Sequence, residues 1–209
     1  MLAHAPWSRV TYVRSGNVEE NRPMHMARQV QPLVWTLDEL DRLPDDGNKY
    51  ELVRGELFVT PAPSPRHERI VVVLSDILGD YVRAHGIGRA FRARAVVRVK
   101  GNEVEPDIMV RQWTAHAQEK WEHVPLPLLV VEVLSGVTRR RDSSSKREFY
   151  LDLGIPDYWI VDGTARTIRS IRPGTEDVVA SDVLSWHPLK AAEPLALDIP
   201  AMFREALGD

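Results

Sequence analysis

The sequence of 209 residues contains no cysteine. This absence excludes disulfide bonds, thiolate metal ligands and a cysteine nucleophile, and it fits a reducing compartment. The sequence also has no run of about 18 apolar residues, so no membrane-spanning helix is predicted. Nor do its first residues combine a basic segment with an apolar one, as a secretory signal peptide would. We therefore expect a cytoplasmic protein that has no membrane partner.

Common catalytic motifs are absent too: there is no P-loop, no Gly-x-Gly-x-x-Gly, no His-Glu-x-x-His and no Gly-x-Ser-x-Gly. The formal net charge of −3 argues against a coat protein that binds nucleic acid through many phosphate contacts. It does not exclude an enzyme acting on nucleic acid, because a carboxylate-rich metal site lowers the total. Basic residues gather at 89–100 and 139–141, where they could form a solvated surface or contact phosphates.

The chain is long enough for one domain with a substantial core, and 44% of its residues are hydrophobic. Residues 1–33 show no sustained periodicity and are expected to form a poorly ordered extension, followed by a single domain at 34–209. Periodicity and turn residues predict helices at 36–43, 66–85, 142–153 and 201–207, hairpins at 50–60 and 93–110, strands at 128–134, 157–162 and 166–172, and one or two edge strands in the tail. This order predicts an α/β (mixed α+β) fold, with a central mixed sheet flanked by helices.

Two acidic residues fall on neighbouring predicted strands. Asp107 follows Pro106, whose missing amide hydrogen marks either a sheet edge or a break in strand pairing. Asp107 could therefore border an opening, or it could simply face solvent. Glu132 lies within the apolar run Leu128–Leu134, where burial of an unpaired carboxylate costs several kcal/mol. Glu132 must therefore pair with a base such as arginine, become protonated or bind a cation.

A lysine follows on the next predicted helix. Lys146, Phe149, Tyr150 and Leu153 are spaced i, i+3, i+4 and i+7, which places the lysine on the apolar face of that helix. It could snorkel past the edge of the core. It could also reach back over the strand that carries Glu132.

Two acids and a lysine in this order have a coherent chemistry. Asp107 and Glu132 would supply the hard oxygen ligands that Mg²⁺ or Mn²⁺ prefers. Lys146 would orient a metal-bound water or neutralise a phosphate. The three residues together favour metal-dependent cleavage of a phosphodiester bond.

Several short stretches of the chain resemble the PD-(D/E)-x-K nuclease superfamily, and more closely its Uma-two family of small restriction-type endonucleases. The similarity spans about Tyr50 to Asp162, over half the chain. The matching stretches are Tyr-Glu-Leu-Val-Arg-Gly-Glu at 50–56, Ser-Pro-Arg-His-Glu-Arg-Ile at 64–70, Glu-Pro-Asp-Ile at 105–108, Val-Glu-Val-Leu-Ser at 131–135, Arg141-Asp142 with Lys146 and Tyr150, and Pro-Asp-Tyr-Trp-Ile-Val-Asp at 156–162.

The resemblance implies a restriction-endonuclease-like core in which Asp107 and Glu132 bind metal. The superfamily's lysine lies two residues after the glutamate, where this sequence has Leu134. The resemblance therefore points to Lys146 on the next helix instead. Glu51 and His67 fall within matching stretches and could complete the metal shell. Alternatively, Glu51 is a surface acid of the hairpin and His67 a local hydrogen-bonding residue.

The leading hypothesis is thus an endonuclease that uses Mg²⁺ or Mn²⁺ to hydrolyse phosphodiester bonds in DNA. Because Leu134 replaces the usual lysine, the alternative is a catalytically inactive nuclease-fold protein that acts as a nucleic-acid-binding or regulatory module. A third hypothesis is a structural subunit of a larger mobile-element or defence complex. A homodimer would suit the cutting of both strands of a duplex.

Overall fold

The structure, a computed structural model, describes residues 34–112, 120–135 and 145–208. The predicted extension at 1–33 and the basic segment at 139–141 lie outside the described residues. In the described part of the chain, no helix combines the length and the apolar composition that crossing a bilayer requires.

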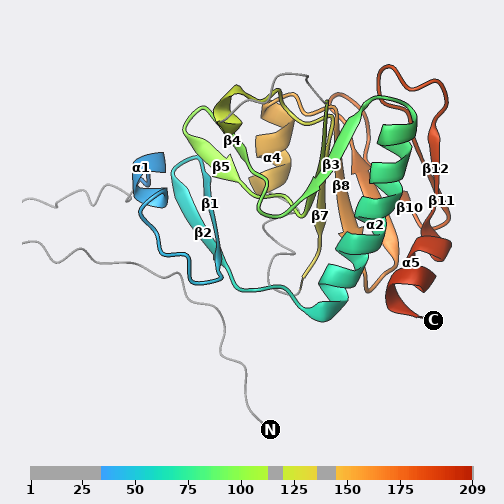
Figure 1. The fold of residues 1–209 in the computed structure, drawn as a ribbon, viewed down its shortest axis with the longest axis horizontal. Helices are drawn as coiled ribbons and strands as arrows, with labels where there is room; N and C mark the ends of the chain where they lie inside the picture. The colour runs from blue at the N-terminus through green and yellow to red at the C-terminus, as the bar shows by residue number, and fades with distance from the viewer. Residues whose placement is uncertain (1–33, 113–119, 136–144, 209) are drawn as a thin grey trace, which may run out of the picture. The chain divides into compact units, whose positions relative to one another are not determined.

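A six-stranded mixed sheet forms the centre of the fold (Figure 1). Its strand order is β10-β9-β8-β7-β6-β3, and only the β7–β8 pair within this sheet is parallel. The strands are β3 (Gly88–Arg92), β6 (Ile108–Gln112), β7 (Leu129–Val133), β8 (Asp157–Asp162), β9 (Thr167–Ile171) and β10 (Val178–Ala180). This arrangement confirms the predicted central mixed sheet.

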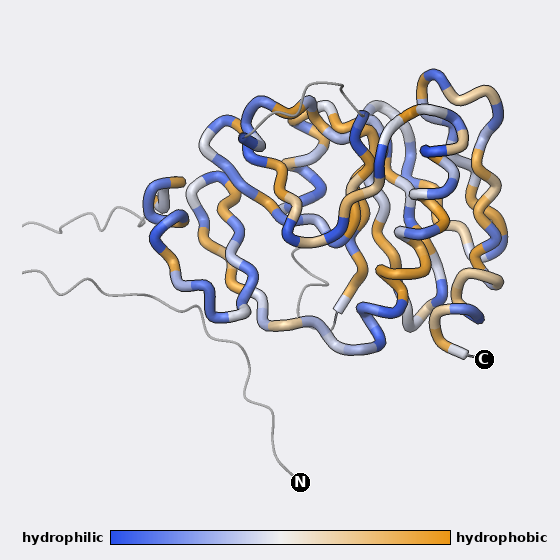
Figure 2. The backbone as a smooth tube through the Cα atoms, in the orientation of Figure 1, coloured by the Kyte–Doolittle hydropathy of each residue, from blue (hydrophilic) through white to orange (hydrophobic). Residues whose placement is uncertain are grey.

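Helices cover the two faces of this sheet because its strands carry apolar residues on both sides. Val131 belongs to the core formed with α2 (Pro65–Ala84) and α5 (Ile199–Leu207), whereas Val130 belongs to the core formed with α4 (Ser145–Asp152). Successive side chains of a strand point to opposite faces, so a continuous apolar run suits a strand buried on both sides. Apolar stretches of the backbone concentrate in the interior strands, as Figure 2 shows.

Two smaller sheets complete the described structure. A four-stranded sheet has the order β2-β1-β5-β4, and a two-stranded sheet pairs β11 with β12. The remaining elements are β1 (Lys49–Val53), β2 (Glu56–Thr60), β4 (Val97–Val99), β5 (Asn102–Val104), β11 (Val183–Trp186), β12 (Leu195–Asp198), α1 (Leu37–Leu40) and the 3-10 helix η1 (Trp121–His123). Helix α1 begins with the predicted capping box, in which Thr36 and Glu39 bond each other's backbone amides.

The predicted hairpin at 93–110 is wrong in its extent, and the correction matters for the site. The turn at Gly101 is correct, but the hairpin consists only of β4 and β5 in the four-stranded sheet. The chain then leaves that sheet at Pro106 and enters the six-stranded sheet as β6. Proline has no amide hydrogen to donate, so strand pairing breaks there. As a result, Asp107 lies at the crossing between the two sheets.

Candidate active site

Asp107 and Glu132 line the same pocket, which has a volume of about 590 Å³. Asp107 immediately precedes β6, and Glu132 lies on the adjacent strand β7. The pocket is bordered by the loop at 60–64, by the first turn of α2 and by the end of β7. Its charged and titratable side chains are those of Lys49, Arg66, His67, Glu68, Arg94, Glu105, Asp107 and Glu132.

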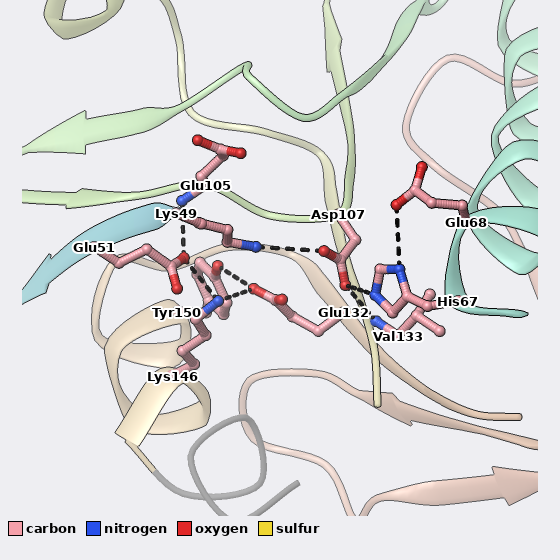
Figure 3. A network of polar contacts seen from close by, with 10 residues as sticks. All are labelled: Lys49, Glu51, His67, Glu68, Glu105, Asp107, Glu132, Val133, Lys146 and Tyr150. Carbon is pink, nitrogen blue, oxygen red and sulfur yellow. Dashed lines mark hydrogen bonds and ion pairs between the residues drawn. The ribbon is translucent and has the colours of Figure 1, made fainter. Parts of the chain in front are cut away.

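The Asp107 carboxylate is held by donors from separate elements (Figure 3). The backbone N–H of Val133 donates to Oδ2 at 2.8 Å, and Nε2 of His67 lies 3.1 Å from the same oxygen. Nζ of Lys49, from β1, donates to Oδ1 at 3.3 Å. The Asp107 side chain keeps 12% of its area exposed. These contacts fix the carboxylate at the pocket wall without closing it off.

The charges around Asp107 keep it ionised. Burial alone would raise the pKa of Asp107, but Lys49 and a hydrogen bond from His67 outweigh burial and lower this pKa well below its usual range. For His67, burial alone would lower the pKa, but contacts with Asp107 and Glu68 raise it above its ordinary value. Both nitrogens of the His67 ring lie within 3.3 Å of a carboxylate oxygen, which favours the doubly protonated ring.

Glu132 belongs to a second, more deeply buried group of charges. Its Oε1 accepts hydrogen bonds from Lys146 Nζ at 2.6 Å and from the Tyr150 hydroxyl at 2.9 Å. Lys146 Nζ also lies 2.8 Å from Glu51 Oε1, and the Glu105 N–H donates to that same oxygen at 3.0 Å. The side chains of Lys146 and Glu51 have no exposed area. The lysine charge is therefore shared by two buried carboxylates from two different sheets.

The surroundings of Tyr150 are both apolar and negatively charged, and both properties affect its pKa. Burial is the main cause that raises the pKa of Tyr150 well above its ordinary value, and the charges of Glu132 and Glu51 add to it. The Tyr150 hydroxyl consequently stays protonated and can only donate to Glu132. Lys146 and Tyr150 are one turn apart on α4, so one helix face positions both donors.

The predicted site residues differ in whether they line the pocket. Asp107, Glu132 and His67 line the pocket, whereas Glu51 and Lys146 do not line it. Glu51 is buried and contacts Lys146 and the Glu105 backbone, so it is not a surface acid. Among the described residues, no three His, Asp or Glu side chains converge in an arrangement that would enclose a metal ion.

Lys49 was not among the predicted site residues, although its side chain contacts Asp107. The sequence does contain a signal for this position, because Lys49 and Glu51 are two residues apart and therefore share one face of a strand. The predicted hairpin began at Tyr50, one residue after the observed start of β1. The backbone N–H of Val133 was also missed, and no sequence pattern marks a main-chain donor of this kind.

The donor set of the pocket suits a hard divalent cation. Asp107 and Glu132 offer carboxylate oxygens, and the low pKa of Asp107 keeps it charged. Mg²⁺ is commonly bound through one or two carboxylates, with water and substrate phosphate supplying its other ligands. Such a site does not need three converging acidic side chains from the protein. The residues present therefore fit a cation that is completed by water and substrate.

A mixed central sheet with helices on its faces matches a nuclease fold. The chain belongs to the Uma2 family, whose family model is described as "Putative restriction endonuclease" and matches residues 37–199. A solved structure from Anabaena variabilis, titled "a putative nuclease belonging to DUF820", is similar to this chain. The two share 26% sequence identity with a TM-score of 0.71, and the similarity covers 83% of this chain and 99% of that one. No curated protein sequence matches the chain.

Proposed function

We propose that this protein is a metal-dependent endonuclease that hydrolyses phosphodiester bonds in DNA. The observation that carries the proposal is the position of Asp107 and Glu132 on adjacent segments of one pocket, each with a lysine against its carboxylate. The nuclease descriptions of the family and of the solved relative support the same reaction class. Asp107 and Glu132 would hold Mg²⁺ or Mn²⁺. Of the two further candidates for the metal shell, His67 would first have to lose a ring proton, and Glu51 would have to leave its buried contact with Lys146, because it does not line the pocket.

When bound, such a cation lowers the pKa of a coordinated water and offsets the charge that builds up on the phosphate. The remaining tasks belong to the chain itself. Val133 N–H and His67 orient the Asp107 carboxylate. Lys146 and Tyr150 do the same for Glu132 from α4. Because these donors are fixed before substrate arrives, the site needs little reorganisation during the reaction.

The test is cleavage of supercoiled plasmid and of single-stranded DNA in the presence of Mg²⁺ or Mn²⁺. Wild-type protein should cut at least one substrate, and Asp107→Asn, which keeps the shape but removes the charge, should lose activity by a factor of 100 or more, about the effect of removing one electrostatic group from an active site. Asp76→Asn is a matched control, because Asp76 is exposed on α2 and does not line the pocket. Equal cutting by all three proteins would contradict the proposal.

A second candidate is a non-catalytic nucleic-acid-binding or regulatory module with the same fold. It is favoured by Leu134, which stands where the superfamily has its lysine, and by the lack of three converging metal-binding side chains in the described residues. Calorimetric titration with Mn²⁺ separates the candidates. A single binding site that is lost in Glu132→Gln favours the enzyme, whereas DNA binding that needs no metal and survives this substitution favours the module. Homodimer formation remains a prediction under either candidate.

A further inference from the structure

The two lysines of the site differ in what their ammonium groups face. Lys146 lies behind the acids, its side chain has no exposed area, and it is not part of the pocket lining. Lys49 lines the pocket, and 16% of its side chain is exposed. Figure 3 shows the two lysines approaching the acids from different elements, β1 and α4. Within this site, Lys49 is therefore the lysine that a molecule in the pocket can reach.

The register of β1 explains this difference in access. Lys49 is the first residue of the strand, and Glu51 is two residues further along on the same face. Glu51 is fully buried and contacts Lys146, whereas Lys49 lies at the end of the strand that borders the pocket. One strand face thus supplies an interior acid and a pocket-facing cation.

The contact distances also indicate that Lys49 is the more available of the two lysines. Lys146 Nζ lies 2.6 Å and 2.8 Å from its two carboxylate oxygens, whereas Lys49 Nζ lies 3.3 Å from Asp107 Oδ1. An ammonium group carries three donors and can serve several acceptors at once. Lys49 can therefore keep its contact with Asp107 while it donates to an anionic oxygen in the pocket.

The two arginines of the pocket lining contact groups other than the acid pair. Arg66 Nη2 donates to the Gly163 carbonyl at 2.8 Å, and exposed Arg94 lies 3.4 Å from Asp45. The Lys49 ammonium group, by contrast, lies at the pocket wall, 3.3 Å from Asp107 Oδ1.

We propose that Lys49 is the catalytic lysine that contacts the substrate phosphate, and that Lys146 is a positioning residue which holds Glu51 and Glu132. This assignment rests on the proposed nuclease function and deepens it. It also explains how the pocket can contain a lysine although Leu134 occupies the usual position. The lysine comes from a preceding strand, and the chain brings it to Asp107 from 58 residues away in sequence.

The experiment is a steady-state measurement of kcat/KM on duplex and on single-stranded oligonucleotides, at a fixed Mg²⁺ concentration and a series of KCl concentrations. Loss of one phosphate contact should make the plot of log(kcat/KM) against log[salt] shallower, by about 0.9 on duplex and about 0.7 on single strands. Lys49→Gln should show this change, together with a fall in kcat of about 100-fold. Lys49→Arg should keep the wild-type slope, because it keeps the charge.

The matched control is Lys190→Gln, the same chemical change at an exposed position that does not line the pocket. Its kcat and slope should equal those of wild type, and thermal melting confirms that each variant is folded. If Lys49→Gln lowers kcat but leaves the slope unchanged, Lys49 only holds Asp107 and the assignment is overturned. If the wild type cuts neither substrate, the proposed nuclease function fails, and the assignment fails with it.

Discussion

Lys146 joins two buried carboxylates, and this makes it the residue on which these buried charges depend. Glu51 and Glu132 come from different sheets, and both contact its Nζ. Removing one member of a buried ionic group leaves its partners charged in an apolar interior, which costs about 3–5 kcal/mol. We expect Lys146→Met to lower the free energy of unfolding by about that amount, measured by urea denaturation.

The neighbouring residue provides a matched control for Lys146. Arg147 lies 2.9 Å from Asp177 but keeps 36% of its side chain exposed, and exposed ion pairs contribute about 0–1 kcal/mol. Arg147→Met should therefore change stability little. Equal losses in the two variants would mean that Lys146 does not compensate the buried acids.

Tyr150 predicts how stability depends on pH in alkaline solution. Burial, then the charges of Glu132 and Glu51, raise the pKa of Tyr150 in the folded protein, whereas an unfolded tyrosine ionises near pH 10. Above that pH the folded state binds one more proton than the unfolded state at this residue. The free energy of unfolding should therefore fall, by about 1.4 kcal/mol per pH unit for one proton.

The comparison with Tyr150→Phe isolates that contribution. The phenylalanine variant should be less stable than wild type at neutral pH, because Glu132 loses a hydrogen bond worth about 1.5–3 kcal/mol. Its stability should fall less steeply above pH 10, because one ionisation has been removed. Parallel curves for the two proteins, from denaturant titrations at each pH, would contradict the raised pKa of Tyr150.

At the scale of elements, prediction from sequence worked where local patterns decide the structure. The capping box at Thr36 and the apolar run that became β7 are both signals carried by adjacent residues. The predicted extent of the hairpin at 93–110 is wrong, because the alternation of apolar and polar residues does not reveal which sheet a strand joins. Burial of Glu132 follows from its apolar neighbours, but the sequence leaves open whether its partner is an arginine or Lys146. Lys146 reaches it only because α4 packs against β7 and β8.

Strand β6 carries a buried arginine that ties separate segments together. Arg111 donates to the backbone carbonyls of Pro125 and, at 2.9 Å, Val96, and its guanidinium lies 5.5 Å from the centre of the Trp121 ring. Arg111→Leu would remove these partly buried hydrogen bonds, and a hydrogen bond to a charged donor contributes about 1.5–3 kcal/mol. We expect a loss of roughly 3 kcal/mol in the free energy of unfolding, measured by urea denaturation.

Arg92 on the paired edge strand β3 serves as the control for Arg111. It is exposed, so Arg92→Leu should change stability by less than about 0.5 kcal/mol. Comparable destabilisation by the two substitutions would show that the carbonyl contacts of Arg111 contribute nothing beyond the loss of a charged side chain.

At the scale of the whole molecule, the ion pairs of the site should allow the protein to fold without a bound metal. Lys49 and Lys146 already offset the charges of Asp107, Glu51 and Glu132, and the six-stranded sheet has its own apolar cores on both faces. Under the proposed function, EDTA should abolish cleavage and leave the circular dichroism spectrum and the folded state intact. Mg²⁺ at about 100 times its Kd should then raise the free energy of unfolding by about 2.7 kcal/mol. Asp107→Asn should remove that increment, whereas unfolding on chelation alone would mean that the fold itself requires the metal.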